Sequence, residues 1–395
     1  MDIQPNQTPP RWWSPMLHPT AFMFWKWVRE RIRLQHHRLV EIEIWGLDHL
    51  RRCISGNHGV LITPNHSSHA DPTVLYWVAD QLKMPFYFMA TWQIFLRANR
   101  LRRLVLRQHG CFSVDRDGTD IRAFRQSVDI LQNKPYPLVI FPEGEIYHIN
   151  RYLTPFRDGP AAIALMASKH ARRPISCVPC GIRYQYLEDP TEELLELMDR
   201  LEQQILWCPK RHMNLQERIY HFAGAILGLK ELEYFGHTQT GTLPERIRTL
   251  TEFILTRLEE KYGILNRASA FPERIKACRR HAILLVEDES LTDAEHAAAQ
   301  VDLVDIFVAT QLFSYPGTVS TGDSTIEEIA ETMDKFEEDV LRAPSASIRG
   351  TRRAIIAFGE PIPVEAHKGD KNQTHALTEL LEQRVQRLLD DNEPT

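Results

Sequence analysis

The chain contains 395 residues, of which 43% are hydrophobic and 25% are charged, and its formal net charge is −5. This composition is that of a globular protein large enough for more than one structural unit, and the net negative charge argues against nucleic acid as a partner. Six cysteines in a chain of this length do not indicate a disulfide scaffold, so a cytoplasmic location is expected. No apolar run reaches the ~20 residues that a membrane-spanning helix needs.

Residues 1–38 form a segment rich in aromatic and basic side chains. Phe, Trp and Met gather between residues 16 and 28, and a basic stretch overlaps and follows them: Lys26, Arg29, Arg31, Arg33 and Arg38. A segment of this kind can lie in the interface of a membrane, with its aromatic side chains in the lipid. A helix that packs on its own domain explains the same pattern, and the sequence does not decide between the two.

Strand and helix patterns alternate in residues 39–189. Apolar runs predict strands at 39–44, 59–63, 85–90, 110–116, 137–141 and 175–182, and helical patterns predict helices at 71–78, 92–108, 120–132 and 161–169. This alternation is typical of an α/β fold with a mixed, largely parallel sheet flanked by helices. The pair Cys177 and Cys180 has the spacing of redox and zinc motifs, but it lies in an apolar run without a second pair, so we assign it to a strand.

Residues 190–349 show almost only helical periodicity. Helices are predicted at 192–207, 215–229, 243–258, 272–285, 293–313 and 326–341, with a loop at 314–324. A strand pattern returns at 353–361, and a helix follows at 377–389. Because a late strand needs a sheet to pair with, we expect it to rejoin the first sheet. Residues 190–349 would then be an all-helical insertion and residues 350–395 would complete the first domain; the alternative is a separate C-terminal helical domain with its own edge strand.

The stretch 64–72 is the first candidate for chemistry, because it joins a buried strand to a helix. His66 lies in the predicted loop, and Asp71 followed by Pro72 suits a helix start, with Asp71 as the N-cap. Five residues apart on a regular helix, His66 and Asp71 would face away from each other, so they meet only if the loop turns back over the helix start. An aspartate bound to one imidazole nitrogen leaves the other nitrogen as a base. The alternative is a surface histidine beside an ordinary N-cap aspartate.

The densest basic cluster lies in the predicted helix 92–108. Its members are Arg97, Arg100, Arg102, Arg103 and Arg107. A solvated helix face is one explanation of this cluster. The other is a surface that meets anionic lipid or the phosphates of a nucleotide-bearing donor.

Four short blocks, taken in order, resemble the glycerolipid acyltransferases, the family of 1-acylglycerol-3-phosphate acyltransferase. Asn65-His66-x4-Asp71 resembles the first block, residues 110–116 the second, residues 141–144 the third and Val178-Pro179 the fourth. The resemblance covers about residues 39–183. Residues 356–361 are also similar to the closing strand of the family, which supports a helical insertion before that strand.

The resemblance implies transfer of an acyl group from acyl-CoA or acyl carrier protein, as co-substrate, to the hydroxyl of a lysolipid acceptor such as 1-acylglycerol-3-phosphate. His66 would be the general base and Asp71 would orient it, without a cofactor. The enzyme would work at a peripheral membrane surface. The residues that the resemblance places in substrate binding are Asn65, Arg116, Glu143, Gly144, Arg157 and Pro179.

The chain departs from the family pattern after the third block. Relatives with phosphate acceptors usually have threonine and arginine there, whereas this chain has Glu145 and Ile146. A carboxylate and an apolar side chain should weaken phosphate binding, although Arg151 or Arg157 could compensate. An acceptor without phosphate and a non-catalytic lipid-binding protein are therefore alternatives.

A metal-dependent hydrolase is a further alternative, because His66, His69 and Asp71 lie close together and residues 236–241 faintly resemble a metallo-β-lactamase element. That family requires the spacing His-x-His-x-Asp-His. The histidines here are three residues apart and Pro72 follows the aspartate, so we predict no metal site.

Overall fold

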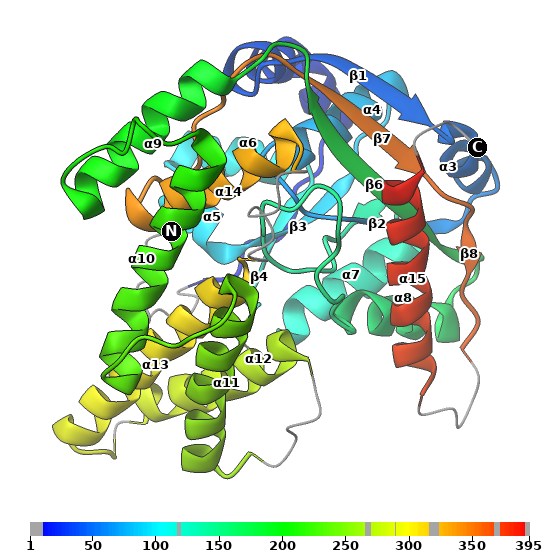
Figure 1. Cartoon of the computed structure of the whole chain (residues 1–395). Coiled ribbons are helices and arrows are strands. Elements are labelled where there is room, and N and C mark those ends of the chain that lie inside the picture. Colours follow the sequence, from blue (N-terminus) through cyan, green and yellow to red (C-terminus); the bar gives the residue numbers. More distant parts are fainter. Residues whose placement is uncertain are drawn as a thin grey trace. The chain divides into compact units, whose positions relative to one another are not determined.

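The computed structural model describes residues 11–116, 120–264, 270–288, 290–315, 324–366 and 372–391. The chain forms two compact units (Figure 1). The first comprises the described residues up to Glu188 together with those from Gly350 onward, and the second comprises Asp189–Arg349. In the part of the chain that is described, no helix combines the length and the apolar content that crossing a bilayer requires.

The first unit is built on an eight-stranded sheet with the order β1-β7-β6-β2-β5-β3-β4, and β8 pairs with β6. The strands are β1 (Leu39–Trp45), β2 (Gly59–Pro64), β3 (Tyr87–Thr91), β4 (Cys111–Val114), β5 (Leu138–Val139), β6 (Ile175–Tyr186), β7 (Arg352–Phe358) and β8 (Ile362–Pro363). Neighbouring strands are parallel, except that β7 and β8 run antiparallel to β6. The prediction of a mixed, largely parallel sheet is confirmed, and Cys177 and Cys180 lie in strand β6 as expected.

The late strand returns to this sheet. Strand β7 pairs with β1 on one side and with β6 on the other, and Figure 1 shows it between them. Ala354–Phe358 is apolar and buried, and such a segment requires backbone partners on both edges because no water reaches it. The predicted return of the strand is confirmed, and the alternative of a separate C-terminal domain with its own edge strand is wrong.

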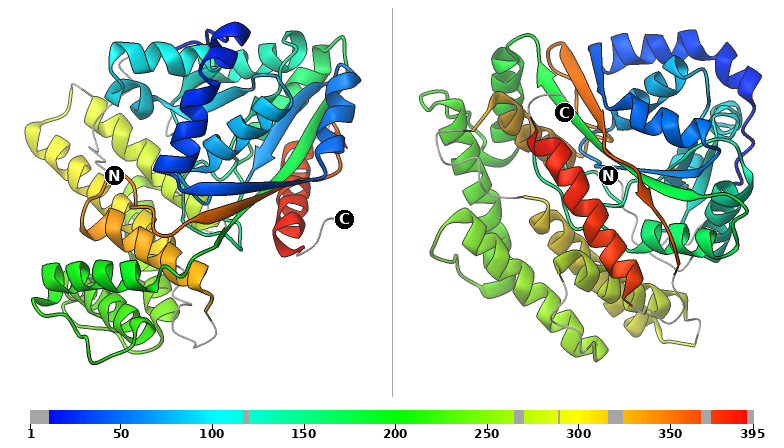
Figure 2. Two further views of the ribbon diagram at one scale, coloured as in Figure 1. Left: turned by 90° about the horizontal axis from the view of Figure 1, so that it is seen from above. Right: turned by 90° about the vertical axis from the view of Figure 1, so that its right-hand side faces the viewer.

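Helices cover both faces of the sheet. On β2, Val60 and Ile62 belong to one apolar core while Leu61 belongs to another, because side chains alternate between the two faces of a strand. The first core is closed by α3 (Leu47–Ser55) and α4 (Asp71–Gln81), and the second by α7 (Ile121–Asn133), α8 (Gly159–His170) and α15 (Gln373–Asp390). Helix α15 packs along β6, as Figures 1 and 2 show.

The predicted helix 92–108 is two helices in the structure, α5 (Trp92–Arg97) and α6 (Arg100–Gln108). Ala98 is extended, and the side chain of Asn99 accepts a hydrogen bond from the backbone N–H of Arg102 at 2.8 Å. Asparagine is among the preferred N-cap residues, so it starts a new helix here. The prediction of one continuous helix is wrong because the apolar spacing runs through both.

The N-terminal segment folds into α1 (Pro19–Phe24), α2 (Lys26–Arg31) and the π-helical turn η1 (Ile32–His36). Part of it packs on the first unit. Phe22 is buried, and the ring of Trp13 stacks on Phe95 with centroids 5.5 Å apart. Phe24 and Trp27 remain exposed. The segment therefore combines a face that packs on its own domain with a face that stays open.

The described residues of the second unit form helices and no strand. The helices are α9 (Thr191–Leu206), α10 (Leu215–Phe235), α11 (Leu243–Tyr262), α12 (Phe271–Glu287), α13 (Asp293–Phe313) and α14 (Ile326–Val340). Arginine–glutamate pairs with N–O distances of 2.7 Å link successive helices: Arg218–Glu202, Arg246–Glu231 and Arg274–Glu259. Most of the predicted loop 314–324 lies outside the described residues.

Candidate active site

The candidate site lies where four parallel strands end. Strands β2, β5, β3 and β4 run in the same direction, so their carboxyl ends share one edge of the sheet. His66 follows β2, Glu143 follows β5 and Arg116 follows β4. Open α/β sheets bind their ligands at this edge. The fold therefore brings together three predicted residues that are far apart in the sequence.

The side chains of His66 and Asp71 meet as the sequence predicts. His66 Nδ1 lies 2.8 Å from Asp71 Oδ2, and the Asp71 side chain is fully buried. The same oxygen accepts the backbone N–H of Ser68 at 3.0 Å, and Asp71 Oδ1 accepts the hydroxyl of Tyr184 at 2.6 Å. Because the bond to Asp71 uses Nδ1, the imidazole presents Nε2 as its basic nitrogen.

Asp71 begins helix α4 differently from the prediction. The N-cap position belongs to Ala70, and Asp71 is the first residue of the helix. The Asp71 carboxylate accepts the N–H of Ser68, before the helix, instead of an N–H inside its first turn. The predicted N-cap role is wrong, because the carboxylate turns toward the loop and the imidazole.

The protonation of His66 is set by burial. Its side chain is 16% exposed, and its ring stacks on Phe141 with centroids 4.0 Å apart. Loss of water lowers the pKa of His66 below its ordinary value of 6.5, and the bond to Asp71 only partly offsets this effect. The imidazole is therefore neutral at neutral pH, which is the state that a general base requires.

Glu143, which follows the neighbouring strand β5, holds the loop of residues 65–70 that carries His66. Its Oε1 accepts the backbone N–H of His66 at 2.6 Å, and its Oε2 accepts both the backbone N–H of Thr154, at 3.0 Å, and the Thr154 hydroxyl. Burial raises the pKa of Glu143 to about 7, although these hydrogen bonds oppose the rise. The resemblance implies a head-group contact for Glu143, whereas in the structure both carboxylate oxygens bind groups of the protein.

Asn65 and Pro179 also form hydrogen bonds with backbone groups of the protein. The Asn65 amide donates to the carbonyl of Ile182 at 3.0 Å and accepts the Ile182 N–H at 2.7 Å, so it ties the loop to β6. Pro179 is buried in β6 opposite Thr63, and its carbonyl accepts the N–H of Gly359 at 2.9 Å. Both were expected in substrate binding, and the structure gives both contacts that support the loop and the sheet.

Arg116, Gly144 and Arg157 form one cluster. Arg116 Nη1 donates to the carbonyl of Gly144, and Arg157 Nη1 donates to the carbonyl of Arg116 at 3.3 Å. Gly144 has φ +77, and a Cβ there would lie 2.6 Å from Arg157 Nε. The positive φ favours glycine here, and any larger side chain would also displace the Arg157 guanidinium. Glu145 Oε1 lies 3.7 Å from Arg116 Nη2.

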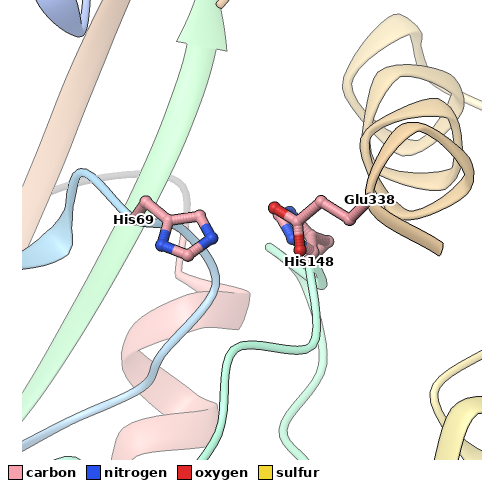
Figure 3. Close-up of side chains that lie close together, drawn as sticks. All are labelled: His69, His148 and Glu338. Carbon is pink, nitrogen blue, oxygen red and sulfur yellow. The ribbon is translucent and has the colours of Figure 1, made fainter. Parts of the chain in front are cut away.

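Two further histidines, His69 of the loop after β2 and His148, lie close together. His69 precedes α4 and His148 follows the third block, and their ring centroids are 5.9 Å apart (Figure 3). His69 therefore adds a second contact between the segments after β2 and β5, beside the bond from His66 N–H to Glu143.

Three residues of this site were not predicted: Tyr184, Thr154 and Phe141, the last of which was recognised only as part of a motif. Tyr184 lies two residues after Ile182 on β6, so the two side chains lie on the same face of the strand. This spacing is the sequence signal that could have indicated Tyr184. Thr154 lies in an irregular segment, where no periodicity indicates its direction.

Comparison with known proteins finds similarity to acyltransferases. Residues 41–183 match the family model described as Acyltransferase. The glycerol-3-phosphate acyltransferase of Pseudoalteromonas atlantica is 28% identical over 163 residues, which cover 40% of this chain and 20% of that protein. The glycerol-3-phosphate acyltransferase of Alteromonas mediterranea is 25% identical over 203 residues, which cover 50% of this chain and 22% of that protein.

The chain thus spans about a fifth of the length of these curated relatives. The residues matched by the family model include the loop after β2 that carries His66, the third block after β5 and most of β6. These matches and the fold support the family named from the motif blocks: residues 41–183 are similar to the acyltransferase domain, and both relatives are glycerolipid acyltransferases.

Proposed function

We propose that this protein transfers a fatty acyl group from an acyl thioester, carried by CoA or by acyl carrier protein, to a hydroxyl of a lysophospholipid. The 2.8 Å contact between His66 Nδ1 and the buried Asp71 carboxylate carries the proposal. A neutral imidazole fixed by a carboxylate is suited to removing a hydroxyl proton. Both relatives are named for transfer to glycerol-3-phosphate, which supports a glycerol-based acceptor.

The reaction is a direct transfer. His66 Nε2 takes the proton of the acceptor hydroxyl while the hydroxyl oxygen attacks the thioester carbonyl carbon. A C–O bond forms and the carbonyl electron pair moves to oxygen. When the carbonyl re-forms, the C–S bond breaks and the leaving thiolate receives the proton from His66. Atoms and charges balance without a covalent acyl-enzyme, and the sequence of steps uses no cofactor besides the thioester co-substrate.

The test is release of CoA from a long-chain acyl-CoA, with glycerol-3-phosphate, 1-acylglycerol-3-phosphate, other lysophospholipids and monoacylglycerol as acceptors. A parallel series uses acyl carrier protein as donor. We expect turnover with at least one acceptor and a loss of about 10²-fold or more in His66→Ala, the range for removal of a general base. His375→Ala is the matched control, because the His375 side chain is 71% exposed on α15.

Two outcomes would contradict the proposal. Wild-type protein that turns over no acceptor, yet binds lysolipids, would favour the non-catalytic lipid-binding alternative. A His66→Ala variant as active as wild type would show that another group acts as the base.

We also propose that the enzyme works at the surface of an anionic membrane. Phe24 and Trp27 on α1 and α2 are 69% and 60% exposed, and Leu101 on α6 is 65% exposed. Exposed basic side chains accompany them on the same helices or on α5: Lys26, Arg31, Arg97, Arg100 and Arg102. Aromatic and leucine side chains that enter lipid, together with cations that meet anionic head groups, are the features of an interfacial segment.

Hydrogen bonds connect the N-terminal segment to helix α6 and the residue after it. His109, just after α6, donates from Nδ1 to the carbonyl of Val105, so its Nε2 accepts a hydrogen bond from Arg29 of α2 at 2.9 Å. The backbone N–H of Met16 donates to the carbonyl of Arg107 at 2.9 Å. Helix α5 follows β3, whose carboxyl end lies at the same sheet edge as His66. Contact with lipid there would bring the membrane near the loop that carries the base.

A further inference from the structure

The Glu145 carboxylate lies beside Arg116, the arginine that the family resemblance places in acceptor binding. Arg116 follows β4, at the sheet edge that also carries His66, and its positive charge contributes to lowering the pKa of His66. One guanidinium nitrogen, Nη1, donates to the carbonyl of Gly144. The other, Nη2, lies 3.7 Å from Glu145 Oε1. The Arg116 and Glu145 side chains are 27% and 14% exposed, so solvent screens this pair only partly.

Arg116 has both a second cation and a carboxylate among its neighbours. Arg157 is the second cation of the cluster, through its bond to the Arg116 carbonyl at 3.3 Å. Glu145 Oε1 lies 3.7 Å from Arg116 Nη2, whereas the oxygens of Glu143, one residue before Gly144, bond His66 N–H and Thr154. The cluster therefore holds the Glu145 carboxylate beside its two arginines and is not a purely cationic pocket. Arg116 also has one of its two terminal nitrogens committed to a backbone carbonyl, which reduces the donors left for a bidentate anion.

The carboxylate beside Arg116 affects which acceptor head groups can bind there. A phosphate monoester carries a charge of about −1.5 to −2 at neutral pH. Beside Arg116, such a group would meet the Glu145 carboxylate, which repels it and competes for the same N–H donors. A phosphodiester carries a single charge, and an uncharged glycerol head group carries none. Hydroxyl or amine groups on such acceptors can donate hydrogen bonds to Glu145.

We propose that Glu145 selects the acceptor by its charge, and that the preferred acceptor is a lysolipid whose head group carries at most one negative charge. The inference rests on the proposed acyl transfer and narrows its substrate class. It separates this chain from the two relatives named for glycerol-3-phosphate, whose acceptor is a phosphate monoester.

The experiment compares kcat/KM for three acceptors with the same acyl chain: 1-acylglycerol-3-phosphate, lysophosphatidylglycerol and monoacylglycerol. CoA release is measured for wild type, for Glu145→Gln, and for Glu379→Gln as the matched control, since Glu379 is 60% exposed on α15. We expect wild type to use the diester or the uncharged acceptor best. In Glu145→Gln the ratio of kcat/KM for the monoester to that for the diester should rise by about tenfold or more, because like charges in a site cost this much or more.

A second variant keeps the test decisive if Glu145→Gln folds poorly. Glu145→Thr with Ile146→Arg removes the carboxylate and adds a cation, and the same ratio should rise further. Adding Arg116→Gln to either variant should abolish the gain for the monoester alone.

The failures are distinguishable. Turnover that requires His66, combined with a ratio that stays unchanged in both variants, overturns the role of Glu145 and leaves acyl transfer intact. A wild-type preference for 1-acylglycerol-3-phosphate overturns the inference as well. Absence of turnover with every acceptor overturns the proposed function, and the inference with it.

Discussion

The hydroxyl of Tyr184 donates a 2.6 Å hydrogen bond to Asp71 Oδ1, while His66 Nδ1 bonds Asp71 Oδ2. Tyr184 reaches this position because β6 continues past the end of β2: Cys180 lies opposite Pro64, and β6 ends only at Tyr186. The strand thereby bonds the carboxylate oxygen of Asp71 that His66 does not use. Both oxygens of Asp71 are bonded, so its carboxylate plane, and with it the imidazole, has one orientation.

The Tyr184→Phe variant tests this positioning role. Removal of a hydrogen bond to a charged group costs about 1.5–3 kcal/mol. If this free energy is lost from the transition state, kcat should fall by about tenfold or more, while KM for the acceptor stays close to the wild-type value. Tyr152→Phe, on an exposed tyrosine, is the control and should retain full activity.

A pH profile separates positioning from a loss of folding in Tyr184→Phe. Without the Tyr184 hydroxyl, the charge on Asp71 acts more fully on His66 and raises its pKa. The acid limb of kcat/KM should therefore move to higher pH than in wild type. An unmoved limb with a lower plateau would mean that the variant merely lost active protein.

The pH dependence of the wild-type enzyme follows from His66. Its folded-state pKa lies below 6.5, and the base must be neutral, so kcat/KM should fall only as the pH drops through a value below 6.5. In Asp71→Asn the partner that raises this pKa is lost. The acid limb should then shift to still lower pH, and the plateau should drop by about 10²-fold or more because the imidazole loses its orientation. A limb above pH 6.5 in wild type would contradict the burial argument.

Glu143 makes stability depend on pH. Its folded-state pKa is raised to about 7 from 4.5, so between about pH 4.5 and 7 the folded protein holds a proton that the unfolded chain releases. The free energy of unfolding should therefore decrease as the pH rises through this window, by about 3 kcal/mol from this group. Glu143→Gln resembles the protonated acid and lacks this contribution.

Urea denaturation of wild type and Glu143→Gln at pH 5 and at pH 7.5 measures the difference. Glu379→Gln serves as the control, and its stability should follow that of wild type at both pH values. If wild type instead gains stability relative to Glu143→Gln as the pH rises, the hydrogen bonds to the carboxylate outweigh the cost of its burial.

Binding to vesicles tests the proposed membrane surface. The double variant Leu101→Ser with Leu104→Ser removes exposed apolar side chains from α6, and we expect it to sediment less with phosphatidylcholine vesicles that contain phosphatidylglycerol. Wild-type binding should weaken with salt and with vesicles of phosphatidylcholine alone, because the arginines need anionic lipid. Leu229→Ser, a comparably exposed leucine of α10, should bind as wild type does. Equal sedimentation of the α6 double variant and of Leu229→Ser would contradict the placement of the membrane-binding surface on α6.

Much of the fold was predictable from local pattern. The alternation of apolar runs and helical periodicity identified β2, β6 and β7, and the strand pattern of residues 353–361 indicated a strand that needs a sheet to pair with. The errors were local. The apolar spacing that runs through residues 92–108 concealed the break at Asn99, and a short strand such as β8 has too few residues to show a period.

By itself, the sequence determined the pair of groups that the chemistry needs, because His66 and Asp71 are five residues apart and a single turn brings them together. Only the tertiary structure decided what holds that pair. Tyr184 lies 113 residues from Asp71, and Glu143 lies 77 residues from His66. Which strand ends face one another depends on sheet order and register, and these follow from packing of the whole unit, to which no local pattern responds. The same holds for Glu145: its identity was plain in the sequence, and its position beside Arg116 was settled by the turn after β5.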